Sequence, residues 1–256
     1  MSTAQSNALM DNKLRLVAPP HEKAVIKYDR PQQPTLSLRF KDNQPRFIVY
    51  TNVDGDKDNG RIEAAMDCYT LALVFETVIE MADRPDAEPV FIECKNFIYP
   101  GGKRSDAPVV VAKIVVAWDR NTGYLSLSVV SYDKSRPVII FPIVPTEYHN
   151  VCDRSGNVVD TKTTSRLFAK GWAKWMSAIA AQISVKEHMS ADEIKARKEA
   201  NQQNRGGGNR SGGGNGGGWN KPQGGQQNRG NGNSNGGYNQ RPAAVAADDV
   251  DDDIPW

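Results

Sequence analysis

Residues 109–118 read Val-Val-Val-Ala-Lys-Ile-Val-Val-Ala-Trp, and this run decides the fold. Valine and isoleucine are β-branched and are favoured in strands. The next five residues, Asp119-Arg120-Asn121-Thr122-Gly123, are typical of a tight turn. Residues 124–132 then alternate, with Leu125, Leu127 and Val129 on one face and Tyr124, Ser126, Ser128, Val130 and Tyr132 on the other. The pattern predicts two strands joined by a turn.

The segments upstream and downstream add further strands. Residues 35–40 (Thr-Leu-Ser-Leu-Arg-Phe) alternate strictly, and residues 46–51 follow after a polar turn, so we expect a hairpin there. Strand character is also found at residues 23–28, 90–99 and 136–142. Short strands joined by hairpins and interrupted by one helix predict a small closed or partly open β-barrel, with a β-sandwich as the alternative.

Two longer helices are predicted from apolar residues at helical spacing. The first covers residues 61–82, where the residues expected to cover the sheet are Ile62, Met66, Tyr69, Leu73 and Val74. The second covers residues 165–186, with an apolar stripe of Phe168, Trp172, Trp175, Ile179 and Ile183. We expect this stripe to pack on the strands, and the alternative is a surface for a protein partner or for self-association. The fold class is therefore mainly β with added helices, the C-terminal helix being packed on the barrel.

The composition divides the chain of 256 residues into four parts. Fifteen of the 22 glycines follow Asn201, in a Gly/Asn/Gln/Arg-rich stretch that is too polar to bury a core. Ser190-Ala191-Asp192-Glu193 is a capping box that opens a short helix before this stretch. We expect a flexible N-terminal arm at 1–20, a core at 21–200, a disordered linker at 201–247 and an acidic tip at 248–256.

The net charge of +2 conceals opposite charges near the C-terminal end. Residues 201–247 contain five arginines or lysines and no carboxylate, whereas residues 248–256 contain five aspartates. The two contributions cancel, so the rest of the chain keeps the +2. Binding of a polyanion therefore requires that the basic side chains of the core be gathered on one face.

The last nine residues read Asp-Asp-Val-Asp-Asp-Asp-Ile-Pro-Trp. Two apolar side chains, Ile254 and Trp256, can enter a pocket on a partner protein while the carboxylates meet lysine or arginine around it. Pro255 fixes one backbone angle, so less entropy is lost on docking. We expect this segment to be a protein-docking peptide, and the alternative is an acidic tail that only aids solubility.

The hexapeptide Asp251-Asp252-Asp253-Ile254-Pro255-Trp256 resembles the C-terminal tip of the bacterial and bacteriophage single-stranded DNA-binding proteins, which usually end in phenylalanine. The order of core, Gly-rich linker and acidic tip is also similar to that family. The resemblance implies an OB-fold-like core that coats and protects single-stranded DNA without strong sequence preference. It also implies a tip that recruits replication, recombination and repair proteins, such as a polymerase, primase, helicase or nuclease.

The core is longer than in the bacterial form of that family, which favours a bacteriophage-encoded relative. The expected location is then the cytoplasm of the host, or of the bacterial cell if the source is bacterial. Whether the chain is a monomer or a homo-oligomer stays open at this point.

A protein that binds single strands of any sequence combines aromatic rings, on which bases stack, with cations that meet the phosphates. The rings expected on the binding face are Phe91, Phe97, Tyr99, Tyr124 and Tyr132. The cations expected around them are Arg39, Lys95, Lys103, Arg104, Lys113, Arg120, Lys134 and Arg136. The alternative for Phe91 and Phe97 is packing beneath the first predicted helix.

No residue pattern predicts catalysis, a metal or a cofactor. The three histidines are scattered, and neither a GxSxG nor a Walker glycine motif is present. Asp54, Asp56 and Asp58 alternate as in a calcium loop, but position twelve of that loop is Ala65 instead of glutamate. The three cysteines, Cys68, Cys94 and Cys152, are widely spaced and are expected to be reduced and mostly buried.

No apolar stretch reaches membrane-spanning length and no secretory signal is predicted, so we expect no membrane partner. Two other functions stay open. An RNA-binding or RNA-chaperone module is suggested by Arg205-Gly206-Gly207 and the polar linker. An adaptor would bind protein through its core and a second partner through its tip.

Overall fold

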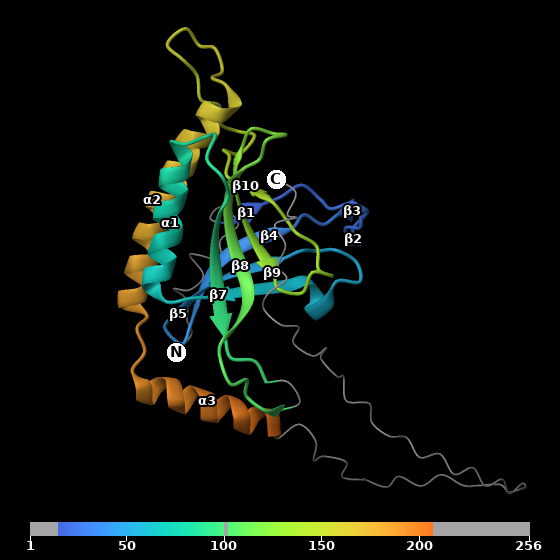
Figure 1. Ribbon diagram of the computed structural model, residues 1–256, viewed down its shortest axis with the longest axis vertical. Helices are drawn as coiled ribbons and strands as arrows, with labels where there is room; N and C mark the ends of the chain where they lie inside the picture. The colour runs from blue at the N-terminus through green and yellow to red at the C-terminus, as the bar shows by residue number, and fades with distance from the viewer. Residues whose placement is uncertain (1–14, 100–101, 207–256) are drawn as a thin grey trace, which may run out of the picture. The chain divides into compact units, whose positions relative to one another are not determined.

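The computed structural model describes residues 15–99 and 102–206. Residues 15–188 belong to one compact unit, and the helix α3 (Ala191–Gly206) belongs to a second. The first unit combines antiparallel sheets with two helices (Figure 1). One sheet has the order β1 (Leu16–Val17), β4 (Thr35–Lys41), β5 (Gln44–Tyr50), β6 (Arg61–Ala65). The other has the order β10 (Phe141–Pro142), β9 (Leu125–Ser131), β8 (Val109–Trp118), β7 (Val90–Asn96).

The β8–β9 hairpin confirms the two strands predicted at residues 109–132. Pairing runs from Ala112 with Ser131 to Trp118 with Leu125. The turn is closed by Asp119, whose carboxylate accepts hydrogen bonds from the Thr122 hydroxyl at 2.6 Å and the Asn121 amide at 2.9 Å. One face of the hairpin is buried in the core through Ala112, Ile114, Val116, Leu125, Leu127 and Val129.

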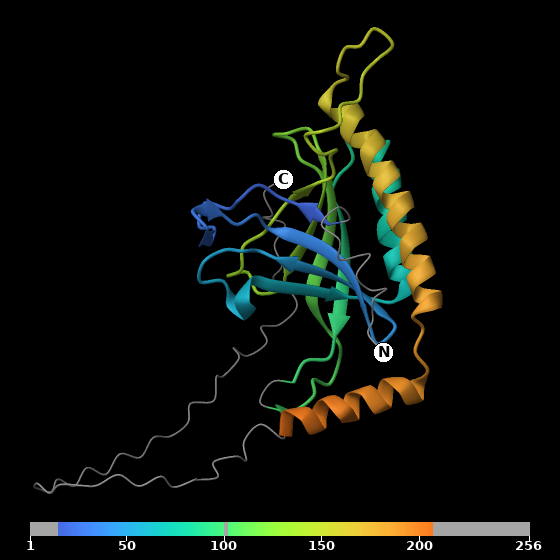
Figure 2. The same ribbon diagram turned by 180° about the vertical axis from the view of Figure 1, so that it is seen from behind.

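The β4–β5 hairpin is also confirmed. Its turn residues Asp42 and Asn43 have φ angles of 53° and 62°, as the primed turns of tight hairpins require. Leu36 and Leu38 are buried, as the alternation predicted. The other three predicted strands form but are shorter than expected: β2 (Ile26–Lys27) within residues 23–28, β7 within residues 90–99, and β10 within residues 136–142. Strand β2 pairs with β3 (Arg30–Pro31) in a separate hairpin, which Figures 1 and 2 show on the side of the sheets away from the helices.

The helix predicted at residues 61–82 begins later than expected. Residues 61–65 form strand β6, in which Ile62 pairs with Val49. Helix α1 (Cys68–Ala82) starts after Asp67, whose side chain accepts a hydrogen bond from the Thr70 amide at 2.7 Å. Its buried face is Leu71, Val74, Phe75, Thr77, Val78, Met81 and Ala82. Tyr69 and Leu73, which were expected to cover the sheet, are exposed.

Helix α2 (Thr161–Lys186) begins four residues before the predicted start and is capped by the Asp160 side chain. Its core face consists mainly of small residues and is formed by Ser165, Ala169, Ala173, Met176, Ala180 and Ile183. Trp172 packs edge-on against Phe75 of α1, with ring centroids 5.8 Å apart. Trp175 does not pack on the strands, contrary to the prediction, and is 63% exposed.

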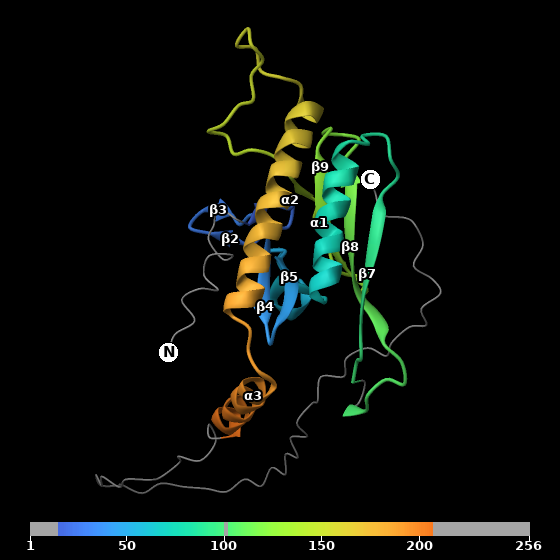
Figure 3. The same cartoon turned by 90° about the vertical axis from the view of Figure 1, so that its left-hand side faces the viewer.

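Helices α1 and α2 lie side by side and run in opposite directions (Figure 3). At one end, Cys68 Sγ lies 3.9 Å from Ser184 Oγ. At the other end, Lys170 Nζ lies 2.5 Å from Asp83. These two contacts fix which parts of the helices are level with one another.

Ser165 joins α2 to the second sheet. Its hydroxyl accepts a hydrogen bond from the Leu125 amide at 2.9 Å and donates one to the Ile143 carbonyl at 3.1 Å. Ser165 and Leu125 are fully buried, so water cannot replace the hydroxyl. A helix side chain therefore completes the hydrogen bonding of the backbone at the start of β9.

The fold class is mixed, with antiparallel sheets and helices, and within residues 15–99 and 102–206 the strands do not close into a barrel. The expected N-terminal arm at 1–20 overlaps strand β1, where Leu16 is buried, so the core begins before residue 21. Most of the predicted linker and the whole tip lie outside the described residues. None of the described helices is both long and apolar enough to cross a bilayer.

A buried ion pair links the two sheets. Arg136, which follows β9, donates five hydrogen bonds, and the side chains of Arg136 and Asp56 are only 6% and 2% exposed. The bonds reach both Asp56 oxygens at 3.0 Å, Asp58, and the carbonyls of Lys57 and Arg61. Burial raises the pKa of the Asp56 carboxyl, but hydrogen bonds from Arg136 and Thr51 outweigh this effect and lower the pKa overall. The acidic loop therefore holds an arginine in place of the calcium considered above.

A second ion pair lies beside the first. Lys57, in the short 3-10 helix η2 (Lys57–Gly60), places Nζ 2.5 Å from Asp133 Oδ2. Hydrogen bonds from Lys57 and Ser135 lower the pKa of Asp133 to about 2. Two contacts between the same two segments thus join the loop after β5 to the loop after β9.

Replacing Arg136 by methionine should lower the free energy of unfolding by about 3–5 kcal/mol, because it leaves the Asp56 carboxylate buried without its partner. The measurement is chemical denaturation. Arg120→Met is the matched control, since Arg120 is exposed and lies 3.7 Å from Glu88. It should change the free energy by less than about 1 kcal/mol. Equal effects of the two substitutions would contradict the role assigned to Arg136.

Candidate nucleic-acid interface

The outer face of β7 and β8 carries a ring and several charges. Phe91 of β7 is 39% exposed, and Lys113 of β8 places Nζ 5.9 Å from the centre of its ring. Glu93 is paired with Lys113 in the strand register. Its carboxylate lies 3.7 Å from Lys113 Nζ and 3.2 Å from Lys95 Nζ. Two lysines around one glutamate leave this part of the face with a net positive charge.

The segment that follows β7 continues the same composition. The guanidinium carbon of Arg104 lies 3.4 Å from the centre of the Phe97 ring, a stacked cation–π contact. Tyr99 is 62% exposed, and Lys103 is exposed as well. The Ser105 hydroxyl holds the base of this loop, because it accepts a hydrogen bond from the Ile98 amide and donates one to the Ala107 carbonyl.

We call these residues together the ring–cation surface. It consists of Phe91, Lys95, Phe97, Tyr99, Lys103, Arg104 and Lys113. The structure thus places seven of the thirteen predicted nucleic-acid-binding residues on one pair of strands and the loop that joins them. Neither phenylalanine belongs to the buried core, in contrast to the alternative of packing beneath the first helix.

The pairing of β7 with β8 shifts by one residue between Cys94 and Lys95, as at a β-bulge. Glu93 is paired with Lys113 and Cys94 with Ala112, but Lys95 is paired with Val110. Val111 of β8 is therefore left without a partner on β7, while Phe91, Glu93 and Lys95 remain exposed on one row of β7. Bulges of this kind bend a strand and redirect its side chains, and they are frequent next to functional sites.

The three cysteines differ in exposure. Cys94 is buried on the inner side of β7, and burial raises the pKa of its thiol to about 11, so it is a structural residue. Cys68 and Cys152 are exposed, which differs from the expectation of mostly buried thiols. All three are free thiols.

The other predicted rings lie on β9 or next to its ends. Tyr124 precedes the strand and Tyr132 follows it, and both are half-buried. Between them Ser126 and Ser128 are buried, so no exposed side chain on that row of β9 connects the two tyrosines. Lys134 is exposed in the loop after Tyr132.

The three remaining predicted arginines do not join the ring–cation surface. Arg39 lies on β4 in the other sheet, opposite Arg46. Arg120 faces Glu88 in the turn after β8. Arg136 uses all five of its N–H donors inside the protein, so it cannot contact phosphate without breaking the buried network.

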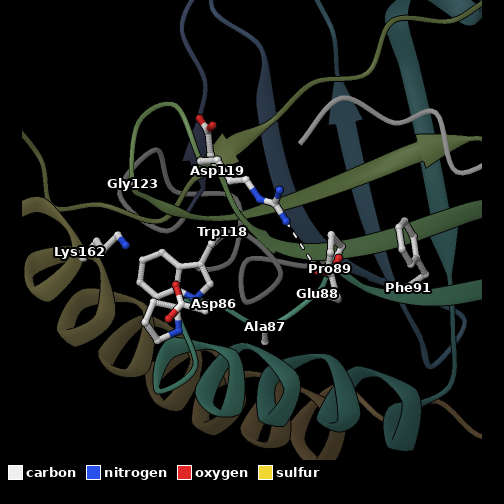
Figure 4. Close-up of a pocket in the computed structure, with 11 residues that line it drawn as sticks. Asp86, Ala87, Glu88, Pro89, Phe91, Trp118, Asp119, Gly123 and Lys162 are labelled. Atoms are coloured by element: carbon white, nitrogen blue, oxygen red, sulfur yellow. Dashed lines mark ion pairs between the residues drawn. The ribbon is translucent and has the colours of Figure 1, made fainter.

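A pocket of about 630 Å³ has Phe91 in its lining (Figure 4). Its walls come from the loop before β7, the end of β8 and the start of α2. Trp118 lies at its base and donates a hydrogen bond from Nε1 to the Met81 carbonyl at 2.7 Å. The charged residues of its lining are Asp86, Glu88, Asp119, Arg120 and Lys162. Carboxylates outnumber cations in this lining, which disfavours a phosphate.

The β2–β3 hairpin was not predicted from the sequence, which indicated only a strand at residues 23–28. Tyr28 at its turn is 86% exposed, and Lys27 places Nζ 5.2 Å from the centre of the Tyr28 ring. Tyr28 and Asp29 have φ angles of 53° and 57°, a conformation that is uncommon for side chains of this size. The sequence places Tyr28 between the cations Lys27 and Arg30. Assigning residues 23–28 to a strand does not reveal that this ring is exposed at a turn.

Comparisons with models of known families, with curated proteins and with solved structures found no match for this chain. Over the described residues, no group of three metal-ligating side chains comes together. The six residues predicted to dock on partners, 251–256, lie outside the described residues and stay a prediction.

The exposed rings should contribute little to stability. Tyr99→Ala should change the free energy of unfolding by less than about 0.5 kcal/mol, as is usual for surface positions. Phe75→Ala is the contrasting variant, because Phe75 is fully buried between Phe47 and Trp172. It should lower the free energy by about 3–5 kcal/mol. Denaturant unfolding measures both, and a large loss for Tyr99→Ala would show that its ring is part of the core.

Proposed function

We propose that this chain is a single-stranded DNA-binding protein that coats unpaired strands with little sequence preference and recruits partner proteins through its acidic C-terminal tip. The observation that carries the proposal is the ring–cation surface, above all Arg104 stacked on Phe97 and Lys113 beside Phe91. Unpaired nucleic acid offers flat bases and phosphate charge, and this surface offers a counterpart to each.

We further infer that the two sheets form an open OB-fold-like arrangement. Strand β6 lies next to β8 and β9, and β1 lies next to β10, so the sheets adjoin at more than one place. In such folds one face of the strands fills the core while the other is available for a strand of nucleic acid. The division between buried Cys94 and exposed Lys95 on β7 is consistent with this use.

The tip supports the second half of the proposal. Residues 251–256 combine three carboxylates with an Ile-Pro-Trp end, and the preceding polar linker gives them reach. A linker of 47 residues spans roughly 35–40 Å as a flexible chain. We infer that a replication or recombination enzyme is the partner, in a bacteriophage-infected or bacterial cytoplasm.

Binding to an oligo-dT strand should be seen as quenching of tryptophan and tyrosine emission. Phe97→Ala removes a stacking ring and should weaken binding by about 1–3 kcal/mol, or ~5- to 150-fold. Lys103→Gln should reduce the slope of log affinity against log salt by about 0.7, the value of one phosphate contact on a single strand. Absence of any binding at low salt would overturn the proposal.

Matched controls come from the loop at the opposite end of the unit. Tyr148 and Arg154 are exposed in the segment before α2, which Figure 1 shows far from the loop after β7. Tyr148→Ala and Arg154→Gln should leave the affinity and the salt slope unchanged. An RNA strand of the same sequence decides between DNA and RNA, and equal or tighter RNA binding would favour the RNA-binding alternative. Partner capture that resists nuclease, without oligonucleotide binding, would favour the adaptor.

Deletion of residues 248–256 should raise the affinity for single-stranded DNA at low salt. The five aspartates are an anionic segment that can compete with phosphates for the same cations. The same deletion should abolish capture of the partner enzyme. An unchanged or lower DNA affinity in the shortened chain would contradict competition by the tip, whereas the coating function would stand.

A further inference from the structure

Helix α2 has an apolar stripe on the face that points away from the core. Leu167, Gly171, Trp175, Ala178 and Val185 recur at helical spacing, and all five are exposed. Trp175 is the largest of them and is 63% exposed, and a contiguous exposed apolar patch of this kind is typical of an interaction site. Gly171 and Ala178 flank Trp175 along the stripe and would allow another helix to approach closely.

Helix α1 has an outward face of a different composition. Tyr69 and Leu73 are its exposed apolar residues and lie near its start, while Glu76 and Glu80 follow. Figure 3 looks onto both helices with the sheets behind them. The outward faces of α1 and α2 therefore form one continuous surface of the unit, which we call the helical face.

Charge is divided between the two halves of the helical face. Helix α2 carries Lys162, Arg166, Lys170, Lys174 and Lys186 and contains no carboxylate. Helix α1 carries Glu76 and Glu80 and contains no cation. Among the described residues Glu76 and Lys174 form no ion pair, so both are available to an outside partner. One half of the face is thus the electrostatic complement of the other.

The apolar and charged residues also match in level along the helices. Because Cys68 is level with Ser184 and Asp83 with Lys170, Tyr69 and Leu73 lie level with the part of α2 that contains Ala178 and Val185. Lys174 lies level with the segment between Glu76 and Glu80. Helix α1 therefore presents its apolar residues level with Ala178 and Val185 of α2, and its carboxylates level with Lys174.

We propose that the helical face binds a second copy of this chain, with α1 of each copy lying over α2 of the other. We consider a twofold axis that lies in the interface and runs parallel to the helices. Rotation about this axis leaves each residue of the second copy at the same height along the helices as in the first copy. It places Glu76 and Glu80 over Lys174 of the partner, and Tyr69 and Leu73 over Ala178 and Val185 of the partner. An axis across the helices would place like helix on like helix and bring equal charges together, which is unfavourable.

This inference is independent of the proposed function, because no nucleic acid takes part. The test is sedimentation equilibrium of the full chain over a range of micromolar concentrations without DNA. We expect a monomer–dimer equilibrium. Trp175→Ser should raise the dissociation constant by roughly 30-fold or more, as loss of a central aromatic does in other interfaces. Tyr148→Ser, which removes an exposed ring elsewhere, is the control and should leave the constant unchanged.

Exchanging the charges of Lys174 and Glu76 tests whether these residues of the two copies face each other. Lys174→Glu and Glu76→Lys should each weaken the dimer by roughly fivefold or more, and the double variant should return to within about threefold of the original chain. Circular dichroism confirms that each variant is folded. A monomer at all concentrations would overturn the proposal. A dissociation constant that is unchanged by Trp175→Ser would also overturn it. So would a double variant in which the losses of affinity caused by the two single charge reversals add up instead of cancelling.

Discussion

The buried pair of Arg136 and Asp56 is the contact on which the arrangement of the two sheets depends. Asp56 belongs to the loop that leaves β5, and Arg136 to the loop that leaves β9, so one guanidinium fixes two segments distant in the chain. The Thr51 hydroxyl donates a hydrogen bond to Asp56 at 2.6 Å. Gly60 lies against that hydroxyl with a φ of +73°, and a Cβ there would be 2.8 Å from it. A side chain at position 60 would therefore collide with the hydroxyl that bonds to the buried Asp56.

The ring–cation surface and the helical face share a physical basis, since each is the outward side of an element whose inward side builds the core. On β7 the inward side is Val90, Ile92 and Cys94, and on α2 it is a row of mainly small residues. The inward residues supply the stability, so the outward ones are free to serve binding. Exposed rings at Phe91, Tyr99 and Trp175 are compatible with a stable fold for this reason.

Alternation in the sequence predicted the β4–β5 and β8–β9 hairpins, because one buried face per strand leaves a clear period of two. The same reasoning failed at residues 61–66, where Ile62, Ala64 and Met66 fit a strand while Ile62 and Met66 also fit a helix. Only pairing with β5 decides between the two. The register shift between β7 and β8 and the burial of Arg136 could not be predicted either, because both arise from partners far away in the chain. Seven of the predicted binding residues still fall together, since they lie on consecutive segments.

Ser165 has a consequence for how the motions of the unit can be observed. The Leu125 amide is held by the Ser165 hydroxyl and not by a strand carbonyl, so its hydrogen can exchange with solvent only when α2 separates from the sheet. Its neighbours on β9 are held within the sheet and open with it. Exchange at this single amide therefore reports undocking of the helix separately from unfolding of the strands.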